Sequence, residues 1–85
     1  IKNFKRDYKR EAKGRYRAIL DTELVAILTM LASDKPLEVR CRDHDLRGNW
    51  LGYRDCHIKP DLVLIYRKVD TNLLARLGSH NELFD

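Results

Sequence analysis

The spacing of apolar residues changes from helical to strand-like partway along the chain. A short amphipathic helix is predicted over residues 4–13, where three apolar side chains lie four residues apart: Phe4, Tyr8 and Ala12. A second helix is predicted to end near Ser33, because Pro36 follows shortly after it. Its apolar face consists of five residues at helical spacing: Leu20, Leu24, Ile27, Leu28 and Leu31. Asp21 is a plausible N-cap, although the pattern could run back to about Arg15.

The second half of the chain carries the patterns that are typical of β-strands. Three strands are predicted, over residues 50–58, 62–67 and 73–77. The middle one is almost continuously apolar, as in a central strand that helices cover. Two turns join the strands as consecutive antiparallel hairpins: Lys59-Pro60-Asp61 and Asp70-Thr71-Asn72. Residues 37–49 form a charged connection before the first strand.

The order of these elements predicts an α+β fold in which both helices pack on one face of a small antiparallel sheet. The 85 residues are enough for one domain with a modest core, and we assign residues 1–85 to it. Because the chain begins at Ile1 and not at Met, we expect further residues before it, and a further strand at or before residues 1–3. The charged N-terminus and the short apolar runs indicate neither a secretory signal nor a membrane span.

Basic residues are concentrated near the N-terminus. Residues 1–20 contain eight Lys or Arg and two acidic residues, whereas the other 65 contain nine basic and eleven acidic residues. A segment of this kind attracts phosphate backbones in a salt-dependent and sequence-independent way. The alternative is an ordinary solvated helix face.

The two cysteines raise the question of a metal site. Cys41 with His44, and Cys56 with His57, could be drawn as zinc ligands. However, the adjacent Cys56 and His57 would point to opposite faces of a strand, which makes them poor joint ligands. We therefore expect no metal and no cofactor, and reduced thiols of the kind usual in the cytoplasm.

The candidate chemistry lies in three histidines and an aspartate. Alternation over residues 50–58 places His57 on the same face as Tyr53 and Asp55. The other face would carry Trp50, Gly52, Arg54, Cys56 and Ile58. Asp61 follows the first turn and so begins the partner strand close to His57. If the strands pair in chain order, four side chains gather at adjacent strand ends: His44, His57, Asp61 and His80. For any one of these histidines alone, an ordinary surface or capping role is the alternative.

Two imidazoles near one phosphate are suited to cleaving RNA. One takes the proton of the ribose 2′-hydroxyl while the other protonates the leaving 5′-oxygen, because imidazole has an ordinary pKa of about 6.5. Arg54 and Arg76 are candidates for the positive charge that stabilises the phosphorane. Phe84 is either a core residue or a platform on which a base stacks. Trp50 and Tyr53 are interpreted as packing residues.

Two segments carry a resemblance to a known family. The run DHDLRGNWLGYRDCHIKPDLVLIY (residues 43–66), followed by RLGSHNELF (residues 76–84), resembles the YafQ branch of the RelE/ParE toxin superfamily. The likeness extends over about residues 36–84. It implies a bacterial toxin of a type II toxin–antitoxin module that enters the ribosomal A site. There it would cut mRNA by attack of the 2′-hydroxyl on the adjacent phosphate. The implied fold has two helices on a small antiparallel sheet.

The same resemblance assigns residues and partners. It implies that four residues serve the chemistry, namely His44, His57, Asp61 and His80, and that Arg76 and Phe84 contact RNA. His80 is the candidate for direct proton transfer, with the general base and the general acid unassigned. The implied partners are a ribbon-helix-helix antitoxin with an acidic half, the ribosome with its rRNA, and mRNA. Operator DNA would be contacted only through the antitoxin, and no membrane is involved.

Two other functions are compatible with parts of the sequence. A ParE-like toxin on the same fold would inhibit DNA gyrase without catalysis, and it would have no need of the histidines. A regulatory or structural protein would use the basic segment alone to bind nucleic acid or an acidic partner. The histidine set favours the endoribonuclease over both.

Overall fold

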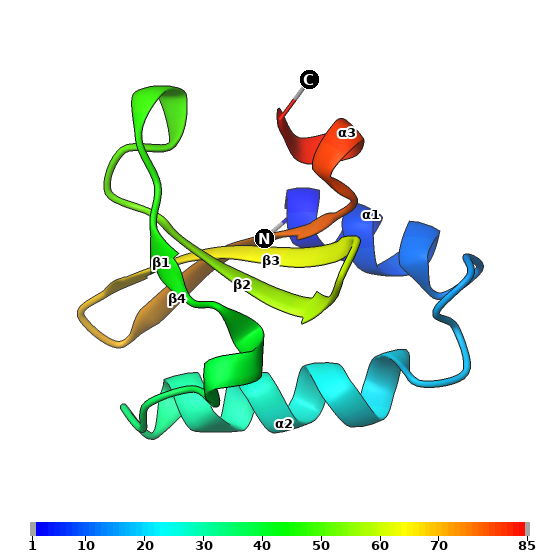
Figure 1. Ribbon diagram of the computed structural model, residues 1–85, viewed down its shortest axis with the longest axis horizontal. Coiled ribbons are helices and arrows are strands. Elements are labelled where there is room, and N and C mark those ends of the chain that lie inside the picture. The colour runs from blue at the N-terminus through cyan, green and yellow to red at the C-terminus, as the bar shows by residue number, and fades with distance from the viewer. Residues whose placement is uncertain (1, 85) are drawn as a thin grey trace.

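The computed structural model describes residues 2–84, in which three helices surround a four-stranded antiparallel sheet (Figure 1). The strands are adjacent in chain order: β1 (His44–Asp45), β2 (Arg54–Lys59), β3 (Leu62–Val69) and β4 (Asn72–Gly78). The helices are α1 (Lys2–Glu11), α2 (Leu20–Ala32) and α3 (His80–Phe84). Two short 3-10 turns, η1 (Val39–Cys41) and η2 (Gly48–Trp50), lie on either side of β1. The predicted α+β fold and its consecutive hairpins are confirmed.

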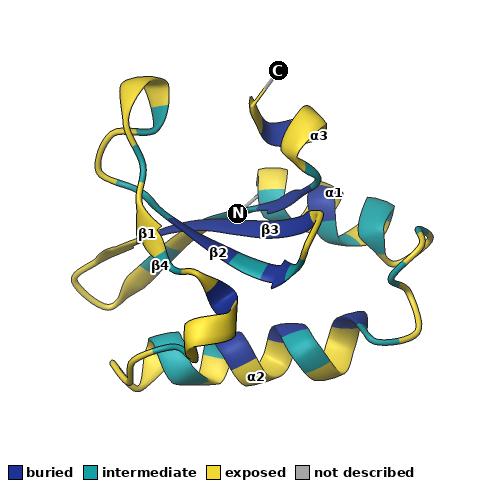
Figure 2. Ribbon diagram, in the orientation of Figure 1, coloured by how far each residue is buried: buried dark blue, intermediate teal, exposed yellow. Residues whose placement is uncertain are grey.

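The main core lies between the N-terminal helices and one face of the sheet (Figure 2). α2 buries three residues of its predicted apolar face: Leu20, Leu24 and Ile27. The sheet contributes buried side chains from β2, β3 and β4: Cys56, Ile58, Leu62, Leu64, Tyr66 and Leu77. α1 runs beside β4, and its Phe4 and Tyr8 pack against this same core. Both helices therefore serve one face of the sheet, as the sequence predicted.

The start of α2 differs from the prediction. The N-cap position is Ile19, whose side chain makes no capping hydrogen bond. Asp21 lies inside the first turn, where its carboxylate accepts a hydrogen bond from the Tyr8 hydroxyl of α1. The predicted Asp21 cap is therefore wrong, because burial of Leu20 draws the helix start towards the core. The Asp21 charge still favours the helix, since it lies near the positive end of the helix dipole.

The sheet has one strand that the sequence did not reveal. β1 contains only His44 and Asp45, which pair antiparallel with Asp55 and Arg54 of β2. Both residues of β1 are polar and exposed, so no alternation of apolar positions marks them as a strand. Directly paired residues share a sheet face, and the pairing therefore fixes His44 beside Asp55.

Residues 50–53, predicted to begin a strand, instead belong to η2 and a turn. Gly48 (φ 64°) and Gly52 (φ 94°) take left-handed conformations, which glycine adopts without strain. Trp50 and Tyr53 consequently meet edge to face, with ring centroids 5.4 Å apart. Both rings pack against a second, smaller core, which confirms their interpretation as packing residues.

The second core lies on the face of the sheet that α2 does not cover. It is formed by Val63 and Ile65 of β3 with Leu83 of α3. In Figure 1, α3 and the η2 turn both rise from this side of the sheet, opposite α2. From residue 54 onwards the predicted alternation is confirmed, since Cys56 is in the main core while His57 belongs to the open face. The C-terminal tail thus forms one wall of that face.

The expected strand at residues 1–3 falls largely in α1, because Lys2 and Asn3 are helical and Ile1 lies outside the described residues. None of the helices within residues 2–84 combines the length and the apolar character that crossing a bilayer requires.

Candidate active site

Three imidazole rings and one phenyl ring form a row on the open face of the sheet. The ring centroids of His44 and His57 are 6.2 Å apart, those of His57 and His80 are 5.4 Å apart, and those of His80 and Phe84 are 5.9 Å apart. Strand register explains the row. His57 pairs with Val63, Val63 pairs with Gly78, and His80 follows two residues later. The structure therefore brings together the histidines that the sequence predicted to gather.

Each imidazole has an oxygen atom close to its Nδ1 atom. His44 Nδ1 lies 2.8 Å from the carbonyl oxygen of Arg42, and His80 Nδ1 lies 3.0 Å from Asp61 Oδ1. His57 Nδ1 is 3.3 Å from Asp55 Oδ1, within ion-pair distance but without the alignment of a hydrogen bond. Carbonyl and carboxylate oxygens only accept hydrogen bonds, so they favour a proton on each Nδ1. The Nε2 atoms are then left for a substrate.

The two carboxylates beside the histidines have different environments. Asp61 is exposed in the β2–β3 turn and accepts two hydrogen bonds from His80, one from the ring and one from the backbone N–H at 3.1 Å. These bonds hold the pKa of Asp61 below its ordinary value. Asp55 is buried, with 3% of its surface exposed, behind His57. The sequence placed Asp55 on the face of His57 but did not include it in the site, although its i−2 spacing was the available signal.

The two predicted phosphate-binding arginines each pair with carboxylates outside the histidine row. Arg54 projects from the opposite face of β2, where it pairs with Asp43 at 3.0 Å and Asp45 at 2.6 Å. Alternation along the strand dictates this position, which is on the other face of the sheet from His57. Arg76 pairs with the buried Asp7 of α1, with Nε and Oδ2 2.7 Å apart. The sequence missed Arg42, which lines a hollow of about 240 Å³ together with His57.

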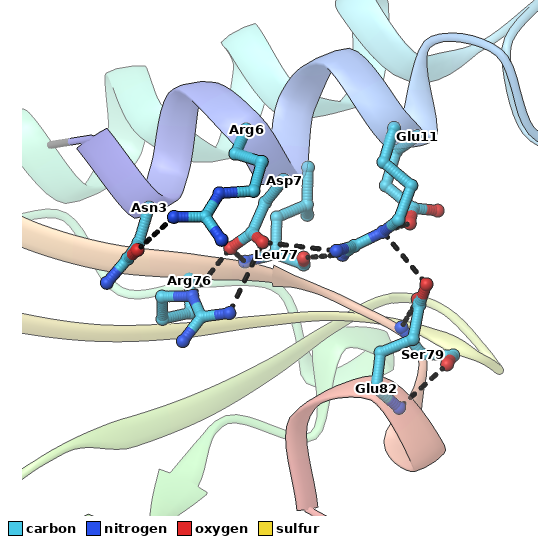
Figure 3. A network of polar contacts seen from close by, with 9 residues as sticks. Asn3, Arg6, Asp7, Glu11, Arg76, Leu77, Ser79 and Glu82 are labelled. Atoms are coloured by element: carbon cyan, nitrogen blue, oxygen red, sulfur yellow. Dashed lines mark hydrogen bonds and ion pairs between the residues drawn. The ribbon is translucent and has the colours of Figure 1, made fainter.

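The position of α3, which carries His80 and Phe84, depends on a network of polar contacts with α1 (Figure 3). Ser79 and Glu82 form a capping box, in which Ser79 N–H donates to Glu82 Oε1 at 2.9 Å and Glu82 N–H donates to Ser79 Oγ at 3.2 Å. Glu82 also pairs with Arg10 of α1 at 2.8 Å. Arg10 donates in turn to the Leu77 carbonyl oxygen at 2.7 Å, so α1 ties the end of β4 to α3.

Substitution of Gly78 tests this network. A Cβ atom on Gly78 would lie 2.7 Å from Arg10 Nη2 and 3.2 Å from Glu82 Oε1, so both side chains would have to move. We expect Gly78→Ala to lower the free energy of unfolding by about 1–2 kcal/mol, the loss of charged hydrogen bonds. It should also speed hydrogen exchange in α3, which mass spectrometry measures. Gly14→Ala is the matched control, because its Cβ would meet only backbone atoms at 3.5 Å or more. Unchanged exchange in the Gly78 variant would contradict this role.

The cysteines and His57, which could be drawn as metal ligands, lie on different faces of the sheet. Within the described range 2–84, no three His, Cys, Asp or Glu side chains converge as a metal site would require. Cys41 and Cys56 are both buried in the main core, on the other side of the sheet from His57. Burial raises the pKa of the Cys56 thiol, which disfavours the thiolate form that binds metals.

Comparisons with known proteins agree with the fold. A family model described as the bacterial toxin of a type II toxin–antitoxin system, YafQ, matches residues 1–85. The mRNA interferase toxin YafQ of Escherichia coli K12 is 42% identical over 64 residues, which cover 73% of this chain and 70% of the relative.

Two solved structures extend the likeness to three dimensions. A copper-bound mutant toxin from Helicobacter pylori is 38% identical, with a TM-score of 0.87 over 99% of this chain and 93% of the other. The E. coli DinJ–YafQ toxin–antitoxin complex contains a chain that is 36% identical, with a TM-score of 0.81 over 98% of this chain and 90% of the other.

The small α+β domain with a histidine row on its open face is thus the fold of a bacterial toxin from a type II toxin–antitoxin system. Within that class, the chain belongs to the YafQ family.

Proposed function

We propose that this chain is a ribosome-dependent endoribonuclease that cleaves mRNA in the ribosomal A site. The observation that carries the proposal is the row of three imidazoles on an open face of the sheet, each with an oxygen atom within 3.3 Å of its Nδ1. A related E. coli protein is named an mRNA interferase, which supports the same activity here. The reaction is attack of the ribose 2′-hydroxyl on the adjacent phosphate, with departure of the 5′-oxygen.

The partners of the imidazoles suggest how the two proton transfers are divided. His80 faces the Asp61 carboxylate, which orients the ring, and we assign to His80 the protonation of the leaving 5′-oxygen. His44 faces the neutral carbonyl of Arg42, so its Nε2 is suited to accepting the proton of the 2′-hydroxyl. His57 lies between them and, backed by Asp55, contacts the phosphate.

Arg42 is the proposed source of positive charge on the phosphorane. Arg42 lines the same hollow as His57, whereas Arg54 is on the far face of the sheet. Two other cations of that hollow, Arg40 and Lys59, each pair with Glu23 at 3.3 Å. No carboxylate within the described residues lies at ion-pair distance from Arg42, so its charge is available for an oxyanion. Phe84, with 39% of its surface exposed, would stack on a base of the mRNA.

The antitoxin is inferred from the E. coli relative, which is found in a complex with DinJ. We infer that a cognate antitoxin with a ribbon-helix-helix DNA-binding half covers this toxin with an acidic half. The exposed side chains of α1 include Lys5, Arg6 and Lys9, which would bind such an acidic chain and, in its absence, rRNA. The toxin would act in the cytoplasm and meet operator DNA only through the antitoxin.

Sequencing of mRNA 5′ ends after brief induction tests the function. New ends should appear inside reading frames and in register with codons, because the A site presents one codon at a time. Co-expression of the antitoxin should remove these ends. Free RNA should be cut at least about 100-fold more slowly than RNA on ribosomes, because the ribosome supplies the constrained geometry. Intact mRNA with gyrase-dependent DNA breaks would replace this proposal with a ParE-like function, and rapid cutting of free RNA would overturn the ribosome dependence.

A further inference from the structure

A second hollow adjoins the histidine row on the open face of the sheet. It has a volume of about 500 Å³ and is lined by Asn49, Trp50, Leu83 and Phe84. Its two walls come from distant parts of the chain, the η2 turn and α3, which Figure 1 shows rising on the same side of the sheet. Leu83 belongs to the second core with Val63 and Ile65, so the hollow has an apolar base.

The two walls each present an aromatic ring. The ring centroid of Phe84 is 5.9 Å from that of His80, which places this wall next to the reacting groups. The Trp50 ring is braced edge to face against Tyr53 at 5.4 Å, and both pack on the second core. The contacts of Trp50 with Tyr53 and the second core therefore leave part of the Trp50 ring facing the hollow. Aromatic faces stack on nucleobases of any sequence.

Asn49 adds hydrogen-bonding capacity at the rim. Its side chain is exposed, and no side-chain hydrogen bond of Asn49 occurs within the described part of the chain. An amide offers a donor and an acceptor side by side, which is the pattern that reads the edge of a base. The stacking faces of the two aromatic rings do not read the edge of a base in this way.

We propose that the hollow between the η2 turn and α3 is a nucleobase pocket, in which Trp50 and Phe84 hold the base next to the scissile phosphate and Asn49 reads its edge. The proposal rests on the endoribonuclease function given above, and it assigns the base preference of that reaction to the η2 turn. It also gives Trp50 a role besides packing. The substrate class is a single-stranded ribonucleotide segment, in which one base enters the pocket while the adjacent phosphate reaches His57 and His80.

Fluorescence offers a direct test of binding, because Trp50 is the only tryptophan among the 85 residues. The probe is a set of short single-stranded RNAs that differ at one position and carry a 2′-deoxy sugar at the cleavage site. Stacking should quench Trp50 with an affinity that depends on the varied base. Asn49→Ala should reduce the ratio between the best and the worst base about tenfold. Asn81→Ala is the matched control, since Asn81 is exposed on α3 and does not line the hollow.

Cleavage supplies an independent measurement on the full chain in a translating extract. Asn49→Ala should flatten the codon preference of the cut sites while cleavage itself continues. Asn49→Asp, which can only accept hydrogen bonds, should shift the preference towards bases that present an amino group. An unchanged codon profile in both variants, beside normal cleavage by the wild type, would overturn the pocket and leave the endoribonuclease function standing. Base-dependent quenching that requires Asn49, without any cleavage by the wild type, would support the pocket and refute the nuclease proposal.

Discussion

His80→Ala is expected to reduce mRNA cleavage by about 10²–10⁴-fold, the usual contribution of a general acid or base. The His80 ring contacts Asp61 at 3.0 Å and lies between His57 and Phe84 in the row. Because 46% of its side chain is exposed, its loss leaves no cavity in either core. The variant should therefore fold with nearly the stability of the wild type, and its expression should no longer arrest growth.

The measurement is single-turnover cleavage in a translating extract, together with the unfolding transition of the purified variant. Asn81→Ala serves as the control, because Asn81 is exposed on the same helix and is not part of the row. A folded His80→Ala protein with full toxicity would refute the assignment of His80 to proton transfer. If the His80→Ala protein does not fold, the same measurements are made on His80→Gln, which keeps a polar side chain at the start of α3.

Asp7→Ala is expected to lower the free energy of unfolding by about 2–4 kcal/mol, because it removes charged hydrogen bonds and leaves the Leu77 N–H without an acceptor. Asp7 is only 1% exposed, although it lies on the basic helix α1. Its carboxylate accepts hydrogen bonds from Arg76 at 2.7 Å and from the Leu77 N–H at 3.0 Å, and it pairs with Arg10 at 3.3 Å. Figure 3 shows Asp7 facing Arg76 and Leu77. Without the Asp7 carboxylate, the Leu77 N–H of β4 loses its hydrogen-bond acceptor.

Chemical denaturation measures this loss, and Lys9→Ala is the matched control. Lys9 is exposed on the same helix, and its removal should change stability by no more than about 0.5 kcal/mol. Asp7→Asn should fall between the two, since it keeps the shape and one acceptor but not the charge. If Asp7→Ala lowers the free energy of unfolding by less than about 1 kcal/mol, this contact does not stabilise the packing of α1 on the sheet.

The same carboxylate predicts how stability depends on pH. Burial alone would raise the pKa of Asp7, but hydrogen bonds from Arg76 and Leu77 and the charges of Arg76 and Arg10 outweigh it, so the pKa is held below its ordinary value. A lowered pKa contributes stability that is complete above the unfolded value of about 3.9 and is lost as the pH falls through the folded value. The wild type should therefore lose stability below about pH 4 more steeply than Asp7→Asn does.

The sequence pattern predicted the positions of the histidines more successfully than those of the arginines. The turn at Pro60 and the alternation around His57 indicated that these side chains meet at adjacent strand ends, and the row in the structure agrees with it. The surroundings of the two candidate phosphate-binding arginines, Arg54 and Arg76, were not predictable in the same way. A long guanidinium has many rotamers, and its position depends on which carboxylates the fold brings close, such as Asp43 for Arg54 and Asp7 for Arg76.

The sequence by itself determined the helices α1 and α2 but not α3, together with the three longer strands, the face of β2 that carries His57, and the membership of the YafQ family through its motifs. These follow from local periodicity and turn chemistry, which act over a few residues. Only the tertiary structure decided the pairing of β1, the burial of Asp55, the α1–α3 network through Arg10, and the hollow between η2 and α3. Each of these joins segments far apart in the chain through short or charged stretches. Such stretches carry no periodic signal, and they take their places only when the two cores have formed.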